Sequence, residues 1–350
     1  MKWNLAATLA AILALGLSAP AQAGPLEDSK AALDRHDYAT ALALLKPLAD
    51  QGDPVAEQRL GTMYFSGKGV DRDTPKALFW TRKAIDHGDA QAREMLASLC
   101  LLDESLPRED CAAAVAAVRQ AAEQGDAADQ MLIGGLYMIG RSGVEKDPAQ
   151  GVAWTSKAAD QGNVQAQMML ATFYDTGVGV AKDGARAIAL YRQAADAGNV
   201  GAQLALAMHY DMGLDVTADP VQAAFWYRKL ADQGDMSSED TLAGMYENGK
   251  GVAADPAHAL MWYRKAAEQG DTGAQAKIGS AYALGKGAPR DYVQAYVWLD
   301  VAAAGQATRA GGGLDDTVLA RDAMVAHLSP AQLTEAKRQS AAWKAKLDTP

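Results

Sequence analysis

The chain has 350 residues, 49% of them hydrophobic, and a formal net charge of -10, so it is long enough to bury a large core. Its Lys and Arg residues are scattered rather than clustered, which argues against a nucleic-acid partner. Five of the seven tryptophans and many of the 33 glycines hold repeated places, so the chain is expected to be one repetitive array rather than several unrelated domains.

Residues 1–23 have the composition of an export signal. Lys2 gives a positive start, Leu5 to Leu17 form an apolar run, and Ala21 to Ala23 resemble a cleavage site. The alternative, a membrane anchor, needs a longer apolar run. We therefore expect cleavage after Ala23 and a mature chain that does not insert stably in a membrane. The predicted location is the periplasm, with secretion as the alternative.

The mature chain is expected to start with an N-terminal capping pair of helices over 24–52, from Leu26 to Arg35 and from Tyr38 to Ala49. From there, glycines that can end a helix in the left-handed conformation recur every 35 to 37 residues. These are Gly52, Gly88, Gly125, Gly162, Gly198, Gly234, Gly270 and Gly305.

This spacing predicts repeats over 53–305, and an Asp or Asn after the terminal glycine can cap the next helix. Inside the units, glycines such as Gly67 and Gly249 end a first helix, and aspartates such as Asp73 and Asp255 start a second. The seven predicted repeats are 53–88, 89–125, 126–162, 163–198, 199–234, 235–270 and 271–305.

Aromatic residues hold fixed places in these units. A tyrosine such as Tyr246 recurs on the first helix, and a tryptophan such as Trp262 recurs on the second beside a small residue such as Ala259. Small residues let helices approach closely while aromatics fill the space between layers. We interpret the aromatics as core; the alternative is a ladder of ligand contacts.

Residues 238–270, SEDTLAGMYENGKGVAADPAHALMWYRKAAEQG, resemble a Sel1-like repeat, a relative of the tetratricopeptide repeat. The resemblance covers about Tyr38 to Gly305. It implies an all-α fold: a right-handed α/α superhelical solenoid of helix pairs with capping helices at both ends. It further implies a non-catalytic adaptor that binds another protein or peptide, because family members serve as adaptors in very different processes.

The unit 89–125 departs from the pattern. It lacks the tyrosine, the paired glycines and the tryptophan; Cys100 stands at the tyrosine position and Cys111 opens the second helix. Exported members of the resembling family contain bridges within a repeat, so a Cys100–Cys111 disulfide is expected, with two buried thiols as the alternative. Two smaller departures are an extra residue in the turn Gly140 to Gly143 and Asp215 at the second turn glycine.

Beyond Gly305 the period ends. A linker over 306–315, a helix from Thr317 to His327, and a helix from Pro330 to Lys346 are expected in the C-terminal capping segment 306–350. Ser329 and Gln332 have the spacing of a capping box. Leu333, Ala336 and Trp343 are expected to cover the last repeat.

No catalytic, cofactor or metal site is predicted. The five histidines fall in different units without paired ligand spacing, and the chain has no Gly-x-Ser-x-Gly nucleophile motif. The histidines are His36, His87, His209, His258 and His327.

A partner-binding surface is expected on the first helices, which line the concave face of such solenoids. Its candidate residues lie outside the core positions, and the alternative for the methionines is partial burial. They are Glu57, Arg59, Met168, Met169, Leu204, Glu239, Asp240 and Lys277.

The sequence therefore favours a monomeric exported scaffold in envelope assembly, envelope signalling or host interaction. The alternative is a cell-wall or β-lactam binding protein or a weak hydrolase. The single cysteine pair argues against that alternative, because the resembling proteins described in this way are rich in cysteine.

Overall fold

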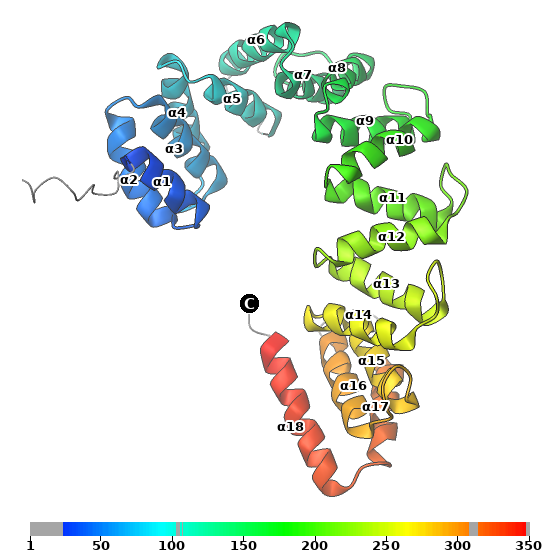
Figure 1. Ribbon diagram of the computed structural model, residues 1–350. Coiled ribbons are helices and arrows are strands. Elements are labelled where there is room, and N and C mark those ends of the chain that lie inside the picture. Colours follow the sequence, from blue (N-terminus) through cyan, green and yellow to red (C-terminus); the bar gives the residue numbers. More distant parts are fainter. Residues whose placement is uncertain (1–23, 103–105, 107, 308–313, 348–350) are drawn as a thin grey trace, which may run out of the picture. The chain divides into compact units, whose positions relative to one another are not determined.

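The computed structural model describes residues 24–102, 106, 108–307 and 314–347 (Figure 1). Within these ranges it contains eighteen helices and no strand, which confirms the predicted all-α solenoid of helix pairs. The predicted signal peptide and the centre of the predicted linker, 308–313, lie outside the described residues. No helix in the described part of the chain combines the length and apolarity needed to cross a membrane. The chain divides after Trp154, inside α8, into two compact units.

The first unit begins with the helix pair α1 and α2, and its consecutive helices pack against one another from α1 to α7. Its helices are α1 (Pro25–Asp34), α2 (Tyr38–Asp50), α3 (Pro54–Ser66), α4 (Thr74–Asp86), α5 (Ala90–Leu102), α6 (Arg108–Gln124), α7 (Ala127–Ile139) and the start of α8 (Pro148–Asp160).

The second unit continues the alternation of first and second helices, and consecutive helices pack together from α9 to α17. Its remaining helices are α9 (Val164–Thr176), α10 (Gly184–Asp196), α11 (Val200–Met212), α12 (Pro220–Ala231), α13 (Met236–Asn248), α14 (Pro256–Glu268), α15 (Thr272–Leu284), α16 (Tyr292–Ala307), α17 (Leu314–Val325) and α18 (Pro330–Leu347).

The ends of the helices have the expected chemistry. The Asp235 carboxylate caps α13 by accepting from the backbone N–H of Ser238 at 2.7 Å, and the helix ends at Gly249, whose φ is 70°. The second turn glycine, Gly251, has a steric role as well. A Cβ atom there would lie 1.9 Å from the carbonyl oxygen of Pro220, so only glycine fits between this turn and α12.

The aromatic residues belong to the packing of the array. Trp226, Trp262 and Trp298 are buried, which agrees with their interpretation as core. Most of the repeat tyrosines are less buried, and a cation lies over many of their rings: Arg186 is 5.4 Å from the ring centre of Tyr174. The same arrangement recurs in both units, so these cations help to hold the tyrosine rings in place.

The C-terminal helices complete the second unit. α18 packs on α16, and the ring centres of Trp298 and Trp343 are 4.8 Å apart, which confirms the expected cover for the last repeat. The predicted capping box is also confirmed. The backbone N–H of Ser329 donates to Gln332 Oε1 at 2.9 Å, and the Gln332 N–H donates to Ser329 Oγ at 3.3 Å.

Candidate binding surface

The fourth residue of the first helix is a buried amide or acid in all the repeats except the one that holds the cysteines. Side-chain amides of three glutamines at this position in the second unit donate to a backbone carbonyl eight residues earlier in the chain: Gln167 to Ala159 at 3.4 Å, Gln203 to Ala195 at 3.2 Å and Gln275 to Ala267 at 3.1 Å. These bonds bridge consecutive helix pairs. The position is therefore structural.

Glu57 and Glu239 occupy this position, and this corrects their expected place on a partner-binding surface. Glu57 is fully buried, and Glu239 is 3% exposed. A carboxylate cannot donate to the carbonyl that receives the glutamine amide, so each acid takes another partner. Glu57 Oε2 lies 2.7 Å from His87 Nδ1, and Glu239 Oε2 accepts from Gln269 Nε2 at 2.7 Å.

Arg59 and Lys277 are each the sixth residue of a first helix, and both make polar contacts within the protein. The Arg59 guanidinium donates to the carbonyl oxygen of Leu26 at 2.8 Å and to Ser29 Oγ at 3.0 Å, so it fixes α1 against α3. Lys277 Nζ lies 3.0 Å from Glu247 Oε2, which also accepts from the Tyr263 hydroxyl at 2.8 Å.

Asp240 lies in the same polar cluster as Lys277. Burial raises the pKa of its carboxyl, as do Asp271 and Glu247, while Lys277 acts in the opposite direction. The structure thus brings Asp240 and Lys277 together between α13 and α15.

The three apolar candidates lie on α9 and α11. Met168 and Met169 are half-buried, and Met168 packs on the core of the second unit. Its Cε would lie 3.3 Å from a Cβ atom at Gly201, so it contacts the start of α11. Leu204, on α11, is 40% exposed. The two methionines are therefore partly buried, as the alternative interpretation of the sequence expected.

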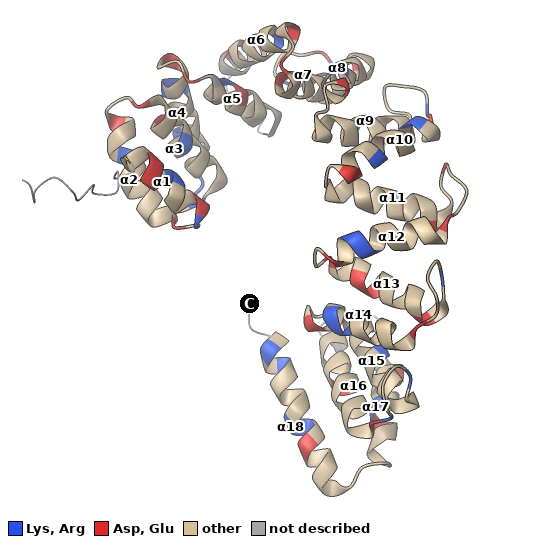
Figure 2. Cartoon of the chain, viewed as in Figure 1, with Lys and Arg blue, Asp and Glu red and all other residues tan. Residues whose placement is uncertain are grey.

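Leu204 belongs to an apolar row that the sequence reasoning missed. Val200, Leu204, Met208 and Met212 follow one another at four-residue intervals along one side of α11, and all four are exposed. At about 1.5 Å per residue the row runs for about 18 Å. α11 contains one acidic residue, Asp211, and no Lys or Arg (Figure 2). The row, called here the α11 row, is the longest apolar stripe among the exposed large hydrophobic side chains that the structure describes.

Seven segments of the chain match the family model of the Sel1 repeat, over residues 29–53, 54–89, 127–163, 164–199, 200–235, 242–271 and 272–306. Together they make up more than half of the chain. The chain belongs to the Sel1 repeat family. Proteins built from Sel1 repeats are in general non-catalytic scaffolds that bind other proteins, so the coarse expectation of a protein-binding role is met.

Among solved structures, the chain is similar to a Sel1 repeat protein from Oxalobacter formigenes, with 28% identity, coverage of 79% of this chain and 98% of that chain, and a TM-score of 0.50. It also aligns with a protective antigen of uropathogenic Escherichia coli that displays an SLR fold, with 24% identity over 99% of this chain and 95% of that chain and a TM-score of 0.34. A third is an immunity protein from Pseudomonas aeruginosa, with 20% identity over 66% of this chain and 83% of that chain and a TM-score of 0.41. No curated protein matches the chain.

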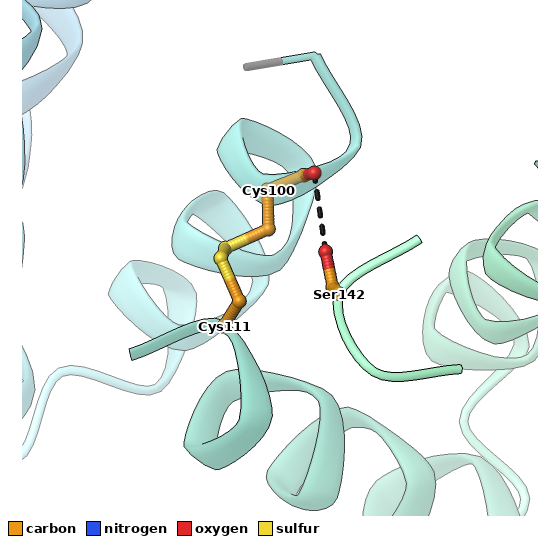
Figure 3. Close-up of a disulfide and its surroundings, with 3 residues drawn as sticks. All are labelled: Cys100, Cys111 and Ser142. Atoms are coloured by element: carbon orange, nitrogen blue, oxygen red, sulfur yellow. Dashed lines mark hydrogen bonds between the residues drawn. A yellow bond between two sulfur atoms is a disulfide. The ribbon is translucent and has the colours of Figure 1, made fainter. Parts of the chain in front are cut away.

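The Sel1 matches pass over residues 90–126, and this segment contains the disulfide. Cys100 and Cys111 are bonded, with 5.7 Å between their Cα atoms, and both are buried (Figure 3). Ser142, in the lengthened turn of the next repeat, has a φ of 58° and donates through its hydroxyl to the Cys100 carbonyl at 3.1 Å. The expected disulfide is confirmed, and the inserted turn residue packs on it.

Proposed function

We propose that this Sel1 repeat protein is an exported, non-catalytic scaffold whose α11 row binds an apolar helix face of another protein in the bacterial envelope. The α11 row carries this proposal. Four exposed apolar side chains at helical spacing suit a partner whose own anchors recur at four-residue intervals. An exposed row of this kind is typical of an interaction site rather than of a free surface.

Two features support export. The first 23 residues have the composition of a signal peptide, and the chain carries a disulfide, a bond that persists in oxidising compartments. Mass spectrometry of the protein recovered from the periplasm tests this directly. We expect an N-terminus at Gly24 and a mass two hydrogens below that of the reduced chain. Recovery of the full-length chain from the cytoplasm would contradict export.

The formal charge of -10 suggests a partner with basic residues beside its apolar anchors. Lys and Arg beside a helix that approaches α11 would meet a chain of net negative charge. Association should then be faster at low ionic strength.

The test of the binding surface uses two matched double variants. In Leu204→Asp/Met208→Asp the α11 row gains two charges; in Val221→Asp/Phe225→Asp the same change is made at exposed apolar positions of α12. All four positions are exposed, so both variants should fold, and circular dichroism checks this. We expect crosslinked pulldown from the envelope to lose one defined partner, by about 10-fold or more, only with the α11 variant. Equal recovery with both variants would overturn the proposed surface.

A further inference from the structure

Three side chains that can ligate a metal meet in the second unit. Asp175 comes from the end of α9, His209 from α11, and Asp215 from the turn that follows α11. One ligand atom from each lies within 4.8 Å of the other two, and His209 Nε2 is 3.3 Å from Asp175 Oδ2. His209 is buried, whereas Asp215 is exposed, so the cluster opens to the surface on one side.

Two of the three residues break the pattern of the repeats. The His209 position holds an apolar residue in the neighbouring units, Phe173 and Met245, both buried. The Asp215 position holds a turn glycine there, Gly179 and Gly251. A buried imidazole and a turn carboxylate thus stand where the other repeats have residues that only pack. The two lie next to each other.

Asp215 is accommodated by a second change. Its φ is 56°, in the left-handed region that glycine occupies in the other turns. α10 in turn begins with Gly184, where α12 and α14 begin with Pro220 and Pro256. A Cβ atom at Gly184 would lie 2.2 Å from the Cβ of Asp215. In the other turns the glycine is in the turn and the larger residue starts the helix, as with Gly251 and Pro220. Here the helix starts with glycine, and this leaves room for the Asp215 side chain in the turn.

The hydrogen bonds of His209 leave its second ring nitrogen facing another acceptor. Nδ1 lies 2.8 Å from the carbonyl oxygen of Leu214, which can only accept, so Nδ1 carries the hydrogen. In the neutral ring Nε2 is then a lone pair, and it faces a carboxylate oxygen, which is also an acceptor. A metal ion between these two atoms would satisfy both acceptors.

The surroundings are those of a metal site with its outer partners in place. The His209 N–H donates to a backbone carbonyl, the Tyr191 hydroxyl donates to Asp175 Oδ2 at 3.4 Å, and Lys182 Nζ lies 3.1 Å from Asp215 Oδ2. Partners of this kind orient metal ligands and fix the tautomer of a ligating histidine. In tetrahedral zinc sites, legs of about 2.0–2.1 Å separate neighbouring ligand atoms by about 3.3 Å, which is the spacing between His209 and Asp175.

We propose that Asp175, His209 and Asp215 bind a divalent transition-metal ion, with Zn²⁺ as the best fit. An imidazole ligand favours zinc and its first-row neighbours over Mg²⁺ and Ca²⁺, which take oxygen ligands. Rotation of the exposed Asp215 side chain completes the set of three. A three-ligand site keeps a further position for water or for a group from a partner. The inference does not depend on the α11 row.

Isothermal titration of tag-free, chelator-treated protein with ZnCl₂ tests the site. We expect one ion per chain and a higher melting temperature in the presence of Zn²⁺. Two variants restore the residues of neighbouring repeats, so both should fold: His209→Met, as at Met245, and Asp215→Gly, as at Gly251. Each should bind Zn²⁺ at least about 10-fold more weakly. His258→Ala, at an exposed histidine 2.6 Å from Asp255 Oδ2, is the control and should bind like the wild type.

Three results would overturn the proposal. The first is no saturable binding of Zn²⁺ by the wild type. The second is wild-type affinity in both His209→Met and Asp215→Gly. The third is a melting temperature of the wild type that Zn²⁺ leaves unchanged.

Discussion

At the buried fourth position of the first helices, the exchange of an amide NH₂ group for a carboxylate oxygen changes the hydrogen bonds between repeats. Gln203 and Glu239 occupy equivalent positions and both accept from a glutamine just after the following second helix, Gln233 and Gln269 respectively. The difference is the second terminal group of the side chain: Gln203 donates to a backbone carbonyl, and a carboxylate there cannot. Burial raises the pKa of Glu239 above its ordinary value of 4.5, because the charged form loses water.

We predict that Glu239→Gln stabilises the protein and that Gln203→Glu destabilises it. A regained neutral hydrogen bond contributes about 1 kcal/mol, or about 2–4 °C in melting temperature for a unit of this size. A group with a raised pKa stabilises the fold when it is protonated and loses that contribution as the pH rises. The advantage of Glu239→Gln over the wild type should therefore be full at about pH 7.5 and shrink as the pH falls toward 4.5, the ordinary value for glutamate. Thermal melts at about pH 7.5 and below pH 4.5 measure this difference. The change in melting temperature should be positive for Glu239→Gln and negative for Gln203→Glu, and the same sign for both would contradict the prediction.

Asp129 is a third buried acid, at a position that holds alanine in other repeats, such as Ala166 and Ala202. Burial, followed by the charges of Glu94 and Asp126, raises its pKa to about 6, and Oδ1 has no hydrogen-bond partner in the described residues. We predict that Asp129→Ala raises the free energy of unfolding at neutral pH by about 1 kcal/mol. The gain should fall as the pH drops through about 6, where Asp129 becomes neutral.

Denaturant titrations at about pH 7.5 and about pH 4.5, on either side of the raised pKa, check this prediction. Asp86→Ala, at an exposed position of the same unit, is the matched control. A gain that is the same at both pH values, or equal for the two variants, would mean that the Asp129 carboxylate is not strained by burial.

The disulfide links α5 and α6 in the repeat that lacks the glycine turn. The other repeats join their helices through glycine-containing turns, whereas α5 and α6 are joined by the bond between Cys100 and Cys111, 11 residues apart. Closing so short a loop contributes about 2–3 kcal/mol in the chain-entropy description. We predict that reduction, or Cys100→Ala/Cys111→Ala, lowers the stability of the first unit by this amount. Denaturant titration with and without reductant measures it, and equal midpoints would contradict a stabilising role.

Most helix boundaries were predictable from residues close by in the sequence, although the helix expected from Thr317 to His327 is observed as Leu314–Val325. Asp and Pro start helices and glycine ends them, so the expected helix from Pro330 to Lys346 is observed as Pro330–Leu347. The candidate site was predicted less well. Glu57 and Glu239 were misplaced because a polar residue was assumed to face solvent, although glutamine at the same place in four other units marks a buried polar position.

The metal-ligand cluster depends on geometry that no spacing rule contains. His209 and Asp215 are six residues apart, but Asp175 reaches them only because α9 and α11 lie in neighbouring repeats. The usable signal was the departure of His209 and Asp215 from the residues of other repeats. In a repeated architecture such departures are where function is expected, since the shared residues are already used for packing.

Across the whole molecule, membership of the Sel1 repeat family fits a role in binding other proteins. Most positions that the repeats share hold the helices together, and the α11 row and the metal-ligand cluster are the features that this packing does not explain. A scaffold of this kind needs no reactive centre. It needs a rigid array that presents one apolar stripe to a partner.

Site-specific photocrosslinking can show whether the α11 row contacts another protein in the cell. A photoreactive amino acid is placed at Met208, in the α11 row, or at Phe225 on α12, which is 48% exposed against 39% for Met208. After irradiation of living cells, we predict one discrete adduct with another protein from position 208 and none from position 225. An adduct from both positions alike, or from neither, would contradict it.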